Sequence, residues 1–476
     1  MPARKSAKKT VKSGRSARSP KNNLPTPPSL WRTIGPSFIL LGLALGSGEL
    51  ILWPYLTANW GLGLLWGGLL GISLQYVLNT EAMRYSLARG ESVFVGFRKL
   101  SWIWPWWFIL STFIPWSLPG FSSASSQIFS RFLGLPSDLW VAIGLLLLTG
   151  VIVSSGKTLV KTMQLFQQPL VLIYVPVIVG LALFLSTQAD WVSLFRGLVG
   201  QGDGYWFFPQ GIAIASFLGA FAYSGAGGNL NLAQSYYIKE KGFGMGVHFE
   251  KISTLMSGQT KAVELEGRNF ADTPANRKKW TQWWWLILRE HFIVFWFLGF
   301  ASIASLALLA KVLAYGVEHG NDLQFLYYEA EQISALVHPF IGTLFLLLAA
   351  IMLFSTQVGV LESSSRIISE NVLLVFFRKG MKFNTSMAFY VALWAQIILG
   401  IVILLAGFQQ PRFLLTLGAV LNGAAMMVAF ALLFFLNRSQ LPEFVRPGKL
   451  RQILTLVGFG FFATFFTILL RDMFLG

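Results

Sequence analysis

Long apolar stretches recur along almost the whole chain, and they constrain its fold more than any other feature. A helix needs about 20 consecutive apolar residues to cross the hydrocarbon core of a bilayer. With 54% hydrophobic and only 12% charged residues, the composition is that of a polytopic membrane protein. We predict an all-α membrane protein with eleven transmembrane spans, at residues 34–57, 62–83, 102–130, 138–153, 164–186, 207–237, 284–313, 339–365, 385–407, 413–436 and 450–471.

The positive charges indicate how these spans cross the membrane. When the N-terminus is placed inside, most of the 37 Lys and Arg residues lie on the cytoplasmic side of this layout. Cytoplasmic loops are enriched in Lys and Arg, and an error of one span would destroy the bias. We therefore predict a plasma- or inner-membrane protein with a cytoplasmic N-terminus and an external C-terminus. The net charge of +17 is explained by loops and anionic lipid, without a nucleic-acid partner.

Polar segments divide the chain around these spans. Residues 1–29 are rich in Lys, Arg, Ser and Pro, and we expect a disordered cytoplasmic tail. Residues 30–472 are predicted to form one polytopic domain, in which the longest polar insertion, 238–283, is a cytoplasmic loop. The chain contains no cysteine, so disulfides and thiolate metal sites are excluded.

The first span is interrupted in its middle, where the sequence reads Gly46-Ser47-Gly48-Glu49. Glycine weakens a helix interior by about 1 kcal/mol, and a carboxylate at the bilayer centre costs about 2.5–3.5 kcal/mol on insertion scales. Unwound backbone with one buried acid is typical of the discontinuous helices that form substrate sites in secondary transporters. The alternative is a glycine-rich packing face, with Glu49 paired to a neighbouring helix.

The sixth span has a similar interruption. From Tyr223 to Asn231 it reads Tyr-Ser-Gly-Ala-Gly-Gly-Asn-Leu-Asn, which a regular lipid-facing helix would not contain. Spans 1 and 6 each open a group of five spans, 34–186 and 207–436, and the odd number gives the two groups opposite orientations. Interrupted helices at corresponding positions of two inverted halves are the best sequence indication of a transporter site. The last span, 450–471, is then an extra helix.

Other polar residues inside the spans are candidates for coupling or gating. Glu81 and Arg84 end span 2 and could form a pair at the inner mouth. Thr356 and Glu362 lie in span 8, although Glu362 could equally be hydrated near the cytoplasmic end. Asn422 lies among small residues of span 10. The histidines all lie outside spans 1 and 6, at His248, His291, His319 and His338.

Motifs of the common alternative classes are missing from the sequence. It contains no Walker loop before a helix, no His-x-x-x-His metalloprotease pair and no Gly-x-Ser-x-Gly elbow. The sequence therefore predicts neither an ATP-driven pump nor an intramembrane enzyme. We expect no cofactor apart from the transported cargo.

Four short motifs occur in a characteristic order. They are Gly35-Pro36-Ser37-Phe38 at the start of span 1, Gly61-Leu62-Gly63-Leu64-Leu65-Trp66 before span 2, Gly219-Ala220 followed by Asn229-Leu230 in span 6, and Ser355-Thr356 through Gly359 in span 8. Over spans 1 to about 10, the chain resembles the natural resistance-associated macrophage protein (Nramp) family of proton-coupled divalent-metal transporters. The resemblance implies a LeuT-like fold of two inverted five-helix repeats plus one extra helix. It also implies discontinuous helices 1 and 6, which alternate access to an ion site at the membrane centre.

The sequence departs from this family at the metal-binding motifs. Where the family has Asp-Pro-Gly-Asn in helix 1, this chain keeps only the glycine, at Gly48, and has Glu49 in place of the asparagine. Where the family has Met-Pro-His in helix 6, the chain has Ala226 followed by two glycines. Because the thioether is lost at that position, we expect oxygen ligands and a harder cation such as Mg²⁺ or Mn²⁺.

We therefore expect a secondary active transporter that imports a divalent cation of the Mn, Mg or Fe class by alternating access with proton coupling. The alternatives are a LeuT-fold carrier for an organic amine, an amino acid or a monovalent ion, and a non-transporting receptor or scaffold. The expected partners are the bilayer, the cargo and protons, and the oligomeric state is left open. In the first reading Glu49 and Asn229 are the metal ligands, although Glu49 could instead bind the coupled proton. The predicted substrate or ion site comprises Gly46, Glu49, Ala226, Asn229, Asn231 and Asn422.

Overall fold

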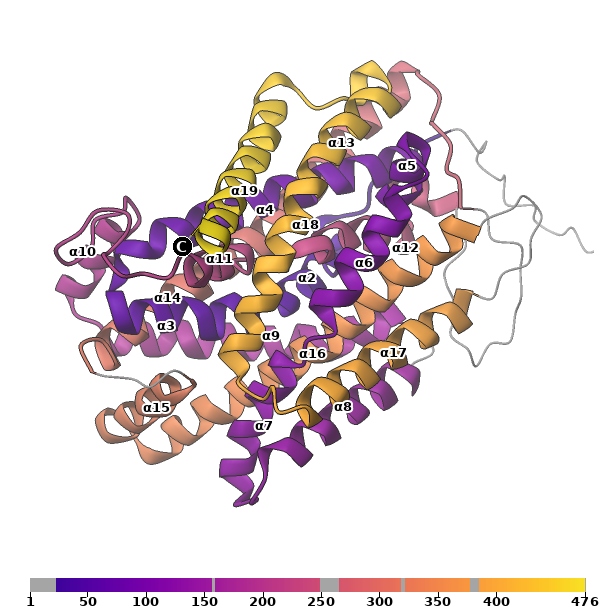
Figure 1. Cartoon of the computed structure of the whole chain (residues 1–476). Helices are drawn as coiled ribbons and strands as arrows, with labels where there is room; N and C mark the ends of the chain where they lie inside the picture. Colours follow the sequence, from indigo (N-terminus) through magenta and orange to yellow (C-terminus); the bar gives the residue numbers. More distant parts are fainter. Residues whose placement is uncertain (1–22, 156–158, 249–264, 318–321, 377–384, 476) are drawn as a thin grey trace, which may run out of the picture.

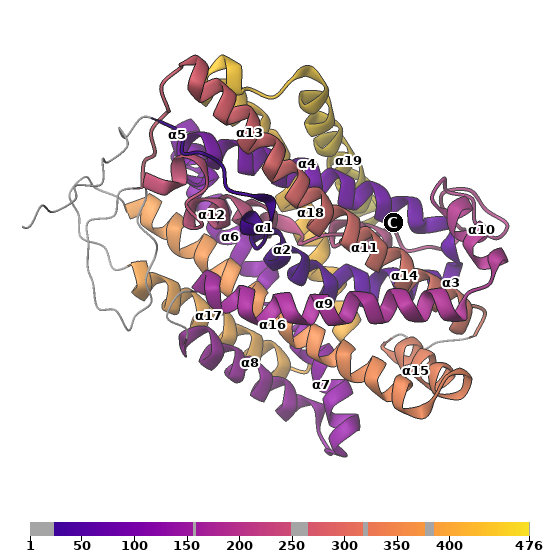
Figure 2. The ribbon, with the colours of Figure 1, turned by 180° about the vertical axis from the view of Figure 1, so that it is seen from behind.

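The computed structural model of the protein describes residues 23–155, 159–248, 265–317, 322–376 and 385–475. Within these ranges the chain is helical, and its only β-type pairing is an isolated bridge between Gln201 and Trp206. Figures 1 and 2 show one bundle of long helices, with α5 (Val93–Leu100) and α12 (Gln234–Glu240) at one end. The short helices α10 (Gln188–Gly197) and α15 (Gln324–Leu336) lie at the opposite end.

Among helices α1 to α9, α1 and α5 lie outside the predicted spans, and the others correspond to the first five of them. Span 3 is divided into two helices around Pro119, since proline has no N–H to continue a helix. The bounds of the helices not yet given are α1 Leu30–Thr33, α2 Pro36–Ala44, α3 Trp53–Trp60, α4 Leu65–Arg89, α6 Trp104–Trp116, α7 Gly120–Leu133, α8 Asp138–Ser155 and α9 Leu159–Leu185.

The two longest helices of the described ranges lie in the second half of the chain. A π-helix, Phe292–Phe297, joins α13 and α14 into one continuous span, and short 3₁₀-helices lie at Leu62–Leu64, Gly228–Ala233, Gly244–His248 and Glu443–Val445. The remaining helices are α11 Ile214–Ala222, α13 Pro274–His291, α14 Leu298–Leu313, α16 Pro339–Phe376, α17 Thr385–Leu405, α18 Pro411–Gln440 and α19 Lys449–Leu475.

Nine helices in the described ranges are long and apolar enough to cross a membrane. The two predicted spans that this set lacks, 102–130 and 207–237, are those that the structure divides into shorter helices. The protein is therefore an integral membrane protein, as predicted, and the count of eleven spans stays a prediction.

Helix 1, the path formed by α2, the π-helix Leu45–Leu52 and α3, lies at the centre of the bundle. Its described side chains from Pro36 to Ala58 are all buried. It packs against α9, α14, α16 and α11, while α18 packs against α11 and α19. From Pro36 to Ala58, helix 1 therefore presents none of its described side chains to lipid.

Two polar segments differ from the prediction. Part of the tail expected to be disordered, residues 23–29, contacts α13: Leu24 donates its N–H to Asn276 Oδ1 at 3.2 Å, and Trp283 donates to the Pro25 carbonyl at 2.8 Å. Residues 1–22 lie outside the described residues. The predicted loop 238–283 is shorter at both ends, because α12 continues to Glu240 and α13 begins at Pro274. Its residues 249–264 also lie outside the described part of the chain.

Candidate functional site

Helix 6, which comprises α11, the 3₁₀-helix Gly228–Ala233 and α12, is broken where the sequence predicts it. Helices 2, 7, 8 and 10 are likewise α4, α13 with α14, α16 and α18. α11 ends at Ala222 and helical structure resumes at Gly228, with Gly227 and Gly228 at φ angles of 77° and 51°. Residues that carry a side chain rarely adopt positive φ angles, which explains why glycine occupies these two positions. All residues from 217 to 238 are buried, so the irregular backbone lies inside protein and not against lipid.

One side chain of α4 satisfies the broken backbone. Gln75 donates from Nε2 to the Ala222 carbonyl at 3.1 Å, and its Oε1 accepts the N–H of Gly227 at 3.2 Å. The same Oε1 accepts Nδ2 of Asn231 at 3.0 Å. Because an unpaired buried polar group costs about 1–3 kcal/mol, Gln75 stabilises the break. Sequence reasoning missed it, and its only signal was an isolated amide in an apolar span.

Asn231 and Asn422 meet beside Gly228. A Cβ on Gly228 would lie 1.8 Å from Asn422 Oδ1, and Asn231 Nδ2 lies 3.3 Å from the Gly228 carbonyl. Asn422 also donates to the Tyr223 hydroxyl at 3.1 Å. Both asparagines are fully buried, and neither Oδ1 has a hydrogen-bond partner among the described residues. Leaving buried acceptors unpaired is costly, so the pair is suited to bind a cation or a donor group.

A thioether lies at the same place. Met426, one turn after Asn422 on α18, has its Sδ 3.3 Å from Nδ2 of Asn231. The sulfur that helix 6 lacks at Ala226 is thus present near the break, on helix 10. Sequence reasoning missed Met426, although residues four apart share one face of a helix and Asn422 was already a candidate.

Asn229 points away from this pair. Its Nδ2 donates to Ser111 Oγ and Thr112 Oγ1 on α6, both at 2.9 Å, and its Oδ1 has no partner in the described part of the chain. Ala226 lies within the break and is also buried. The helix 6 candidates are therefore close in sequence, but their side chains face different helices.

Helix 1 is widened and not unwound, which corrects the expectation of exposed backbone at Gly46. Its middle forms the π-helix Leu45–Leu52, so the helical path is continuous. A Cβ on Gly46 would lie 2.2 Å from Thr356 Oγ1, and a Cβ on Gly48 would lie 2.0 Å from the Tyr223 carbonyl oxygen. Thr356 donates its hydroxyl to the Gly42 carbonyl at 2.9 Å. The two glycines therefore allow helix 1 to approach helices 8 and 6, as the packing alternative proposed.

Glu49 faces away from the helix 6 break. Its Oε1 lies 3.5 Å from the Cβ position of Gly299 on α14, beside Ser302, and within electrostatic reach of Tyr174 on α9. The side chain is fully buried, and neither oxygen has a hydrogen-bond partner in the described ranges. Glu49 and Asn229, expected to bind one metal ion together, face α14 and α6 respectively. The metal-binding role of either residue stays a prediction.

Acidic and imidazole groups do not gather at the break. In the part of the chain that the structure describes, no three His, Asp or Glu residues form a group that could hold a metal ion. Any cation held beside Gly228 would therefore contact amide, carbonyl and thioether groups.

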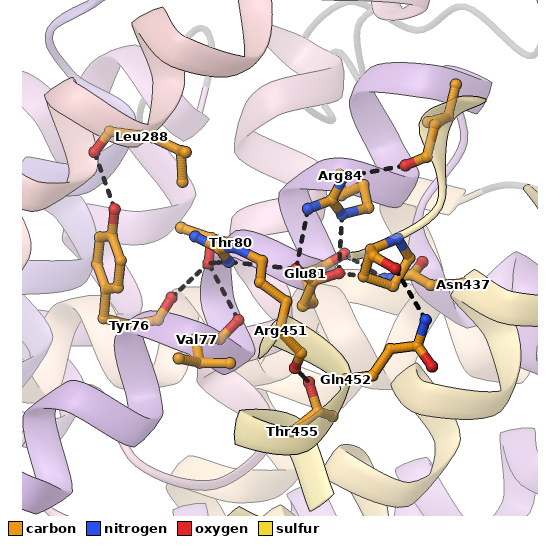
Figure 3. A network of polar contacts seen from close by, with 12 residues as sticks. Tyr76, Val77, Thr80, Glu81, Arg84, Leu288, Asn437, Arg451, Gln452 and Thr455 are labelled. Atoms are coloured by element: carbon orange, nitrogen blue, oxygen red, sulfur yellow. Dashed lines mark hydrogen bonds and ion pairs between the residues drawn. The ribbon is translucent and has the colours of Figure 1, made fainter. Parts of the chain in front are cut away.

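Glu81 and Arg84 form the ion pair expected at the end of helix 2 (Figure 3). Arg84 donates from Nε to Glu81 Oε2 at 2.8 Å and from Nη1 to the Val445 carbonyl at 2.9 Å. Asn437 donates to Glu81 Oε2 at 2.9 Å, and Arg451 donates to Glu81 Oε1 at 3.2 Å. The buried carboxylate therefore joins α4 to α18 and α19, and a role in gating stays a prediction.

Glu362 is buried, so the alternative of a hydrated carboxylate is wrong. Arg366, one turn later on α16, donates to Glu362 Oε1 from Nε at 3.0 Å and from Nη2 at 2.5 Å. Its Nη1 bonds to Glu240 at the end of α12, and Tyr237 of α12 lies 2.7 Å from Ser363 Oγ. These contacts join the second half of helix 6 to helix 8. Sequence reasoning missed Arg366, although its spacing from Glu362 is that of a helical ion pair.

Comparisons with known proteins agree with this architecture. No family model and no curated protein matches the sequence. Among solved structures, a manganese transporter from Eremococcus coleocola has a TM-score of 0.67 at 12% identity, over 94% of this chain and 89% of that chain. The fold is LeuT-like. Mhp1, a nucleobase-cation-symport-1 family transporter, has a TM-score of 0.53 at 13% identity, over 94% and 92% of the two chains.

A third structure, MhsT in complex with L-phenylalanine, has a TM-score of 0.50 at 15% identity, over 92% of this chain and 98% of that chain. At these identities the likeness shows the fold alone. The LeuT-like fold confirms the predicted fold class, and the bounds of the two repeats stay a prediction.

Proposed function

We propose that the protein is a secondary active transporter that moves a divalent metal cation past the break in helix 6. The main support is a pair of side chains beside Gly228. The Oδ1 atoms of Asn231 and Asn422 are buried there and lack hydrogen-bond partners among the described residues. Discontinuous helices of transporters bind ions near the bilayer centre. The fold shared with a manganese transporter and the sequence resemblance to the Nramp family support the same proposal.

The donor groups favour a transition metal over Mg²⁺. Amide oxygens suit hard cations, whereas a thioether binds softer metals and contributes little to Mg²⁺. Because Met426 places sulfur beside Asn231, we propose Mn²⁺ or Fe²⁺ as the preferred cargo. This revises the preference for a harder cation that followed from Ala226. The Ala226 carbonyl is a further oxygen candidate, whereas the side chain of Asn229 would have to turn away from α6 to take part.

Glu49 lies on the opposite face of helix 1 from the break, toward α14. An ionised carboxylate without a partner is expensive to bury, so Glu49 requires a compensating cation or a proton when the helices close around it. We propose that it balances the charge of the metal ion from the other face of helix 1. Thr356 and the Glu81 and Glu362 networks would then hold the helices that move during alternating access.

Metal uptake into proteoliposomes tests the proposal. Asn231→Ala and Asn422→Ala should each reduce the apparent Mn²⁺ affinity by about 10-fold or more, the scale on which metal sites respond to lost supporting groups. Asn269→Ala, an exposed asparagine before α13, is the matched control and should leave uptake unchanged. Uptake by the Asn231→Ala/Asn422→Ala protein that equals wild type would remove the site from the transport path.

A second function is favoured by one observation, the lack of a grouped set of acids or histidines in the described ranges. Neutral amides also suit an organic amine, an amino acid or a monovalent ion. A thermal-shift panel of Mn²⁺, Mg²⁺, Na⁺, amino acids and amines separates the two, because only the bound cargo raises the melting temperature. Stabilisation by organic compounds alone would favour this second carrier. If no compound raised the melting temperature and no metal uptake were observed, the remaining interpretation would be a non-transporting receptor or scaffold.

A further inference from the structure

A buried acid and a buried histidine meet the start of helix 1. Ser37 of α2 donates its hydroxyl to Glu290 Oε2 at 2.5 Å, and its Oγ lies 2.8 Å from Nδ1 of His291. The N–H of Gly35 donates to Glu290 Oε1 at 3.4 Å. Ser37 and His291 are fully buried, and Glu290 is 4% exposed.

Two amides from other helices complete this cluster. Asn79 of α4 has its Nδ2 3.2 Å from Nε2 of His291, and Gln234 of α12 donates from Nε2 to Ser37 Oγ at 3.4 Å. The cluster therefore joins helix 1 to helices 2, 6 and 7. Sequence reasoning set His291 aside, because it lies in neither interrupted span.

The surroundings of the cluster are dry. The imidazole of His291 stacks on Tyr76 at 5.4 Å and on Phe295 at 4.7 Å between ring centroids. Two described charged groups face the cluster. Lys241, which follows α12, faces Glu290, and Arg451 of α19 faces His291. Tyr76 of α4 is a further titratable group beside the cluster, and its hydroxyl donates to the Leu288 carbonyl at 3.1 Å (Figure 3).

When Glu290 is ionised, the contacts define where the protons lie. Since Ser37 gives its hydrogen to Glu290, its oxygen accepts the Nδ1–H of His291, and Nε2 is a bare acceptor for Asn79. One further proton can enter in two ways. Either His291 becomes doubly protonated, or Glu290 is protonated and both hydrogen bonds through Ser37 reverse. In both cases Nε2 of His291 carries a hydrogen and needs an acceptor.

That acceptor is already present. Asn79 Oδ1 is buried and has no partner among the described residues, and a half-turn of the amide presents it to Nε2. Side-chain amides have a donor end and an acceptor end of nearly equal shape, so the turn requires no additional space. The cluster can therefore take up one proton and keep its internal hydrogen bonds.

We propose that Ser37, Asn79, Glu290 and His291 form the site where the transporter binds the proton that crosses with its cargo. The inference rests on the proposed transport function and names the groups that carry its proton. Since Ser37 is the link between the acid and the histidine, a displacement of the start of helix 1 breaks the chain of hydrogen bonds. Water that enters at that moment accepts the proton, so movement of the helix and release of the proton occur together.

A measurement on the solubilised protein tests proton binding without cargo. In protein labelled with ¹⁵N-histidine, the signal lost in His291→Gln identifies His291, and ¹⁵N shifts distinguish a bare Nε2 from a protonated one. We expect Nε2 to be bare at high pH and protonated at low pH, when the cluster takes up its additional proton. In Asn79→Leu, which removes the acceptor, protonation should require a lower pH. An Nε2 that keeps one state throughout would overturn the proposal.

Proteoliposomes with Mn²⁺ outside and a pH indicator inside test the coupling. Glu290→Gln and His291→Gln should lose Mn²⁺-driven acidification of the lumen but retain exchange of Mn²⁺ between equal concentrations. His338→Gln, an exposed histidine before α16, is the matched control and should keep both activities. If either variant fails to fold, Asn79→Leu provides the same comparison.

The outcomes separate the two proposals. Acidification in Glu290→Gln/His291→Gln equal to wild type would overturn the assignment of the proton site. Mn²⁺ uptake by the wild type without acidification would overturn the proton site and leave metal transport standing. Wild-type vesicles that take up no Mn²⁺ would instead overturn the proposed function, and the ¹⁵N measurement would then still decide whether the cluster binds a proton.

Discussion

Helices 1 and 6 contain similar glycine-rich interruptions but respond to them differently. In helix 6, Gly227 and Gly228 take left-handed conformations, and Gln75 pairs with the freed backbone groups. In helix 1, Gly46 and Gly48 stay within a continuous π-helix that packs closely against helices 8 and 6. Glycine in a span is thus compatible with a true break or with close packing, and partners on neighbouring helices decide between them.

The largest effect is expected where the two interruptions touch. Gly48→Ala places a Cβ 2.0 Å from the Tyr223 carbonyl oxygen, so helices 1 and 6 must separate. We expect a loss of about 3 kcal/mol in stability, at the upper end of overpacking effects, with a lower melting temperature and no uptake. Gly180→Ala on α9 is the control, since no described atom lies within 4 Å of its Cβ position. Equal melting temperatures for the two variants would contradict the close packing of helix 1.

Removing the partner of the helix 6 break should have the next largest effect. Gln75→Leu leaves the Ala222 carbonyl and the Gly227 N–H unpaired, and at about 1 kcal/mol for each group, the lower end of the cost of an unpaired buried group, we expect a loss of about 2 kcal/mol. The melting temperature should fall and uptake should decrease, whereas Gln188→Leu, at an exposed position on α10, should change neither. Wild-type stability in Gln75→Leu would mean that the break is held by other contacts.

Neutralising the acid of helix 1 should have a smaller effect, and in the stabilising direction. Glu49→Gln removes a buried carboxyl group that has no partner among the described residues and that must acquire a proton or a cation on folding, so we expect a gain of about 1 kcal/mol. The melting temperature at neutral pH should rise while Mn²⁺ uptake falls. A lower melting temperature would show that Glu49 has a stabilising partner in the folded protein.

The smallest effect concerns the C-terminal end of helix 1, where Asp203 lies 3.1 Å from the Cβ position of Gly61. Lys311 donates to the Asp203 carboxylate at 2.6 Å, and this hydrogen bond lowers the pKa of Asp203. A lowered pKa means that the stabilisation is present above the unfolded value of about 3.9 and is lost as the pH falls through the folded value.

Because Asp203 is half exposed, Asp203→Asn should cost less than about 1 kcal/mol. Melting curves of the variant and the wild type should differ at neutral pH and converge in acid. Added salt should reduce the difference, since exposed charges are screened. A difference that persisted in acid would indicate that Asp203 acts through packing and not through its charge.

Much of the fold could be predicted because lengths of apolar sequence report directly on membrane spans. The prediction failed where polar residues are buried inside a helix. Span 8 was expected to end at residue 365, yet α16 continues to Phe376, since Arg366 pairs with Glu362 and Glu370 accepts the hydroxyl of Ser92 at 2.7 Å. A hydropathy pattern assigns such residues to a loop, because it cannot include the partners that other helices supply.

The candidate site was predictable only in part, for the same reason. Asn231 and Asn422 were proposed because polar groups stand out in apolar spans; in the structure each contacts Gly228, and their role in a site stays a prediction. Gln75 and Met426 were not found, since their role depends on which face of helices 2 and 10 turns toward the break. Glu49 was found, but the helix that it faces was not predictable.

The sequence by itself determined where the chain enters the membrane and where its helices are weak, because hydrophobicity and backbone propensity act over a few neighbouring residues. Only the tertiary structure decided that helix 6 breaks while helix 1 widens, and that Glu290 and His291 meet Ser37. Those outcomes depend on the rotation and separation of helices far apart in the chain, which are set by packing that no local pattern records.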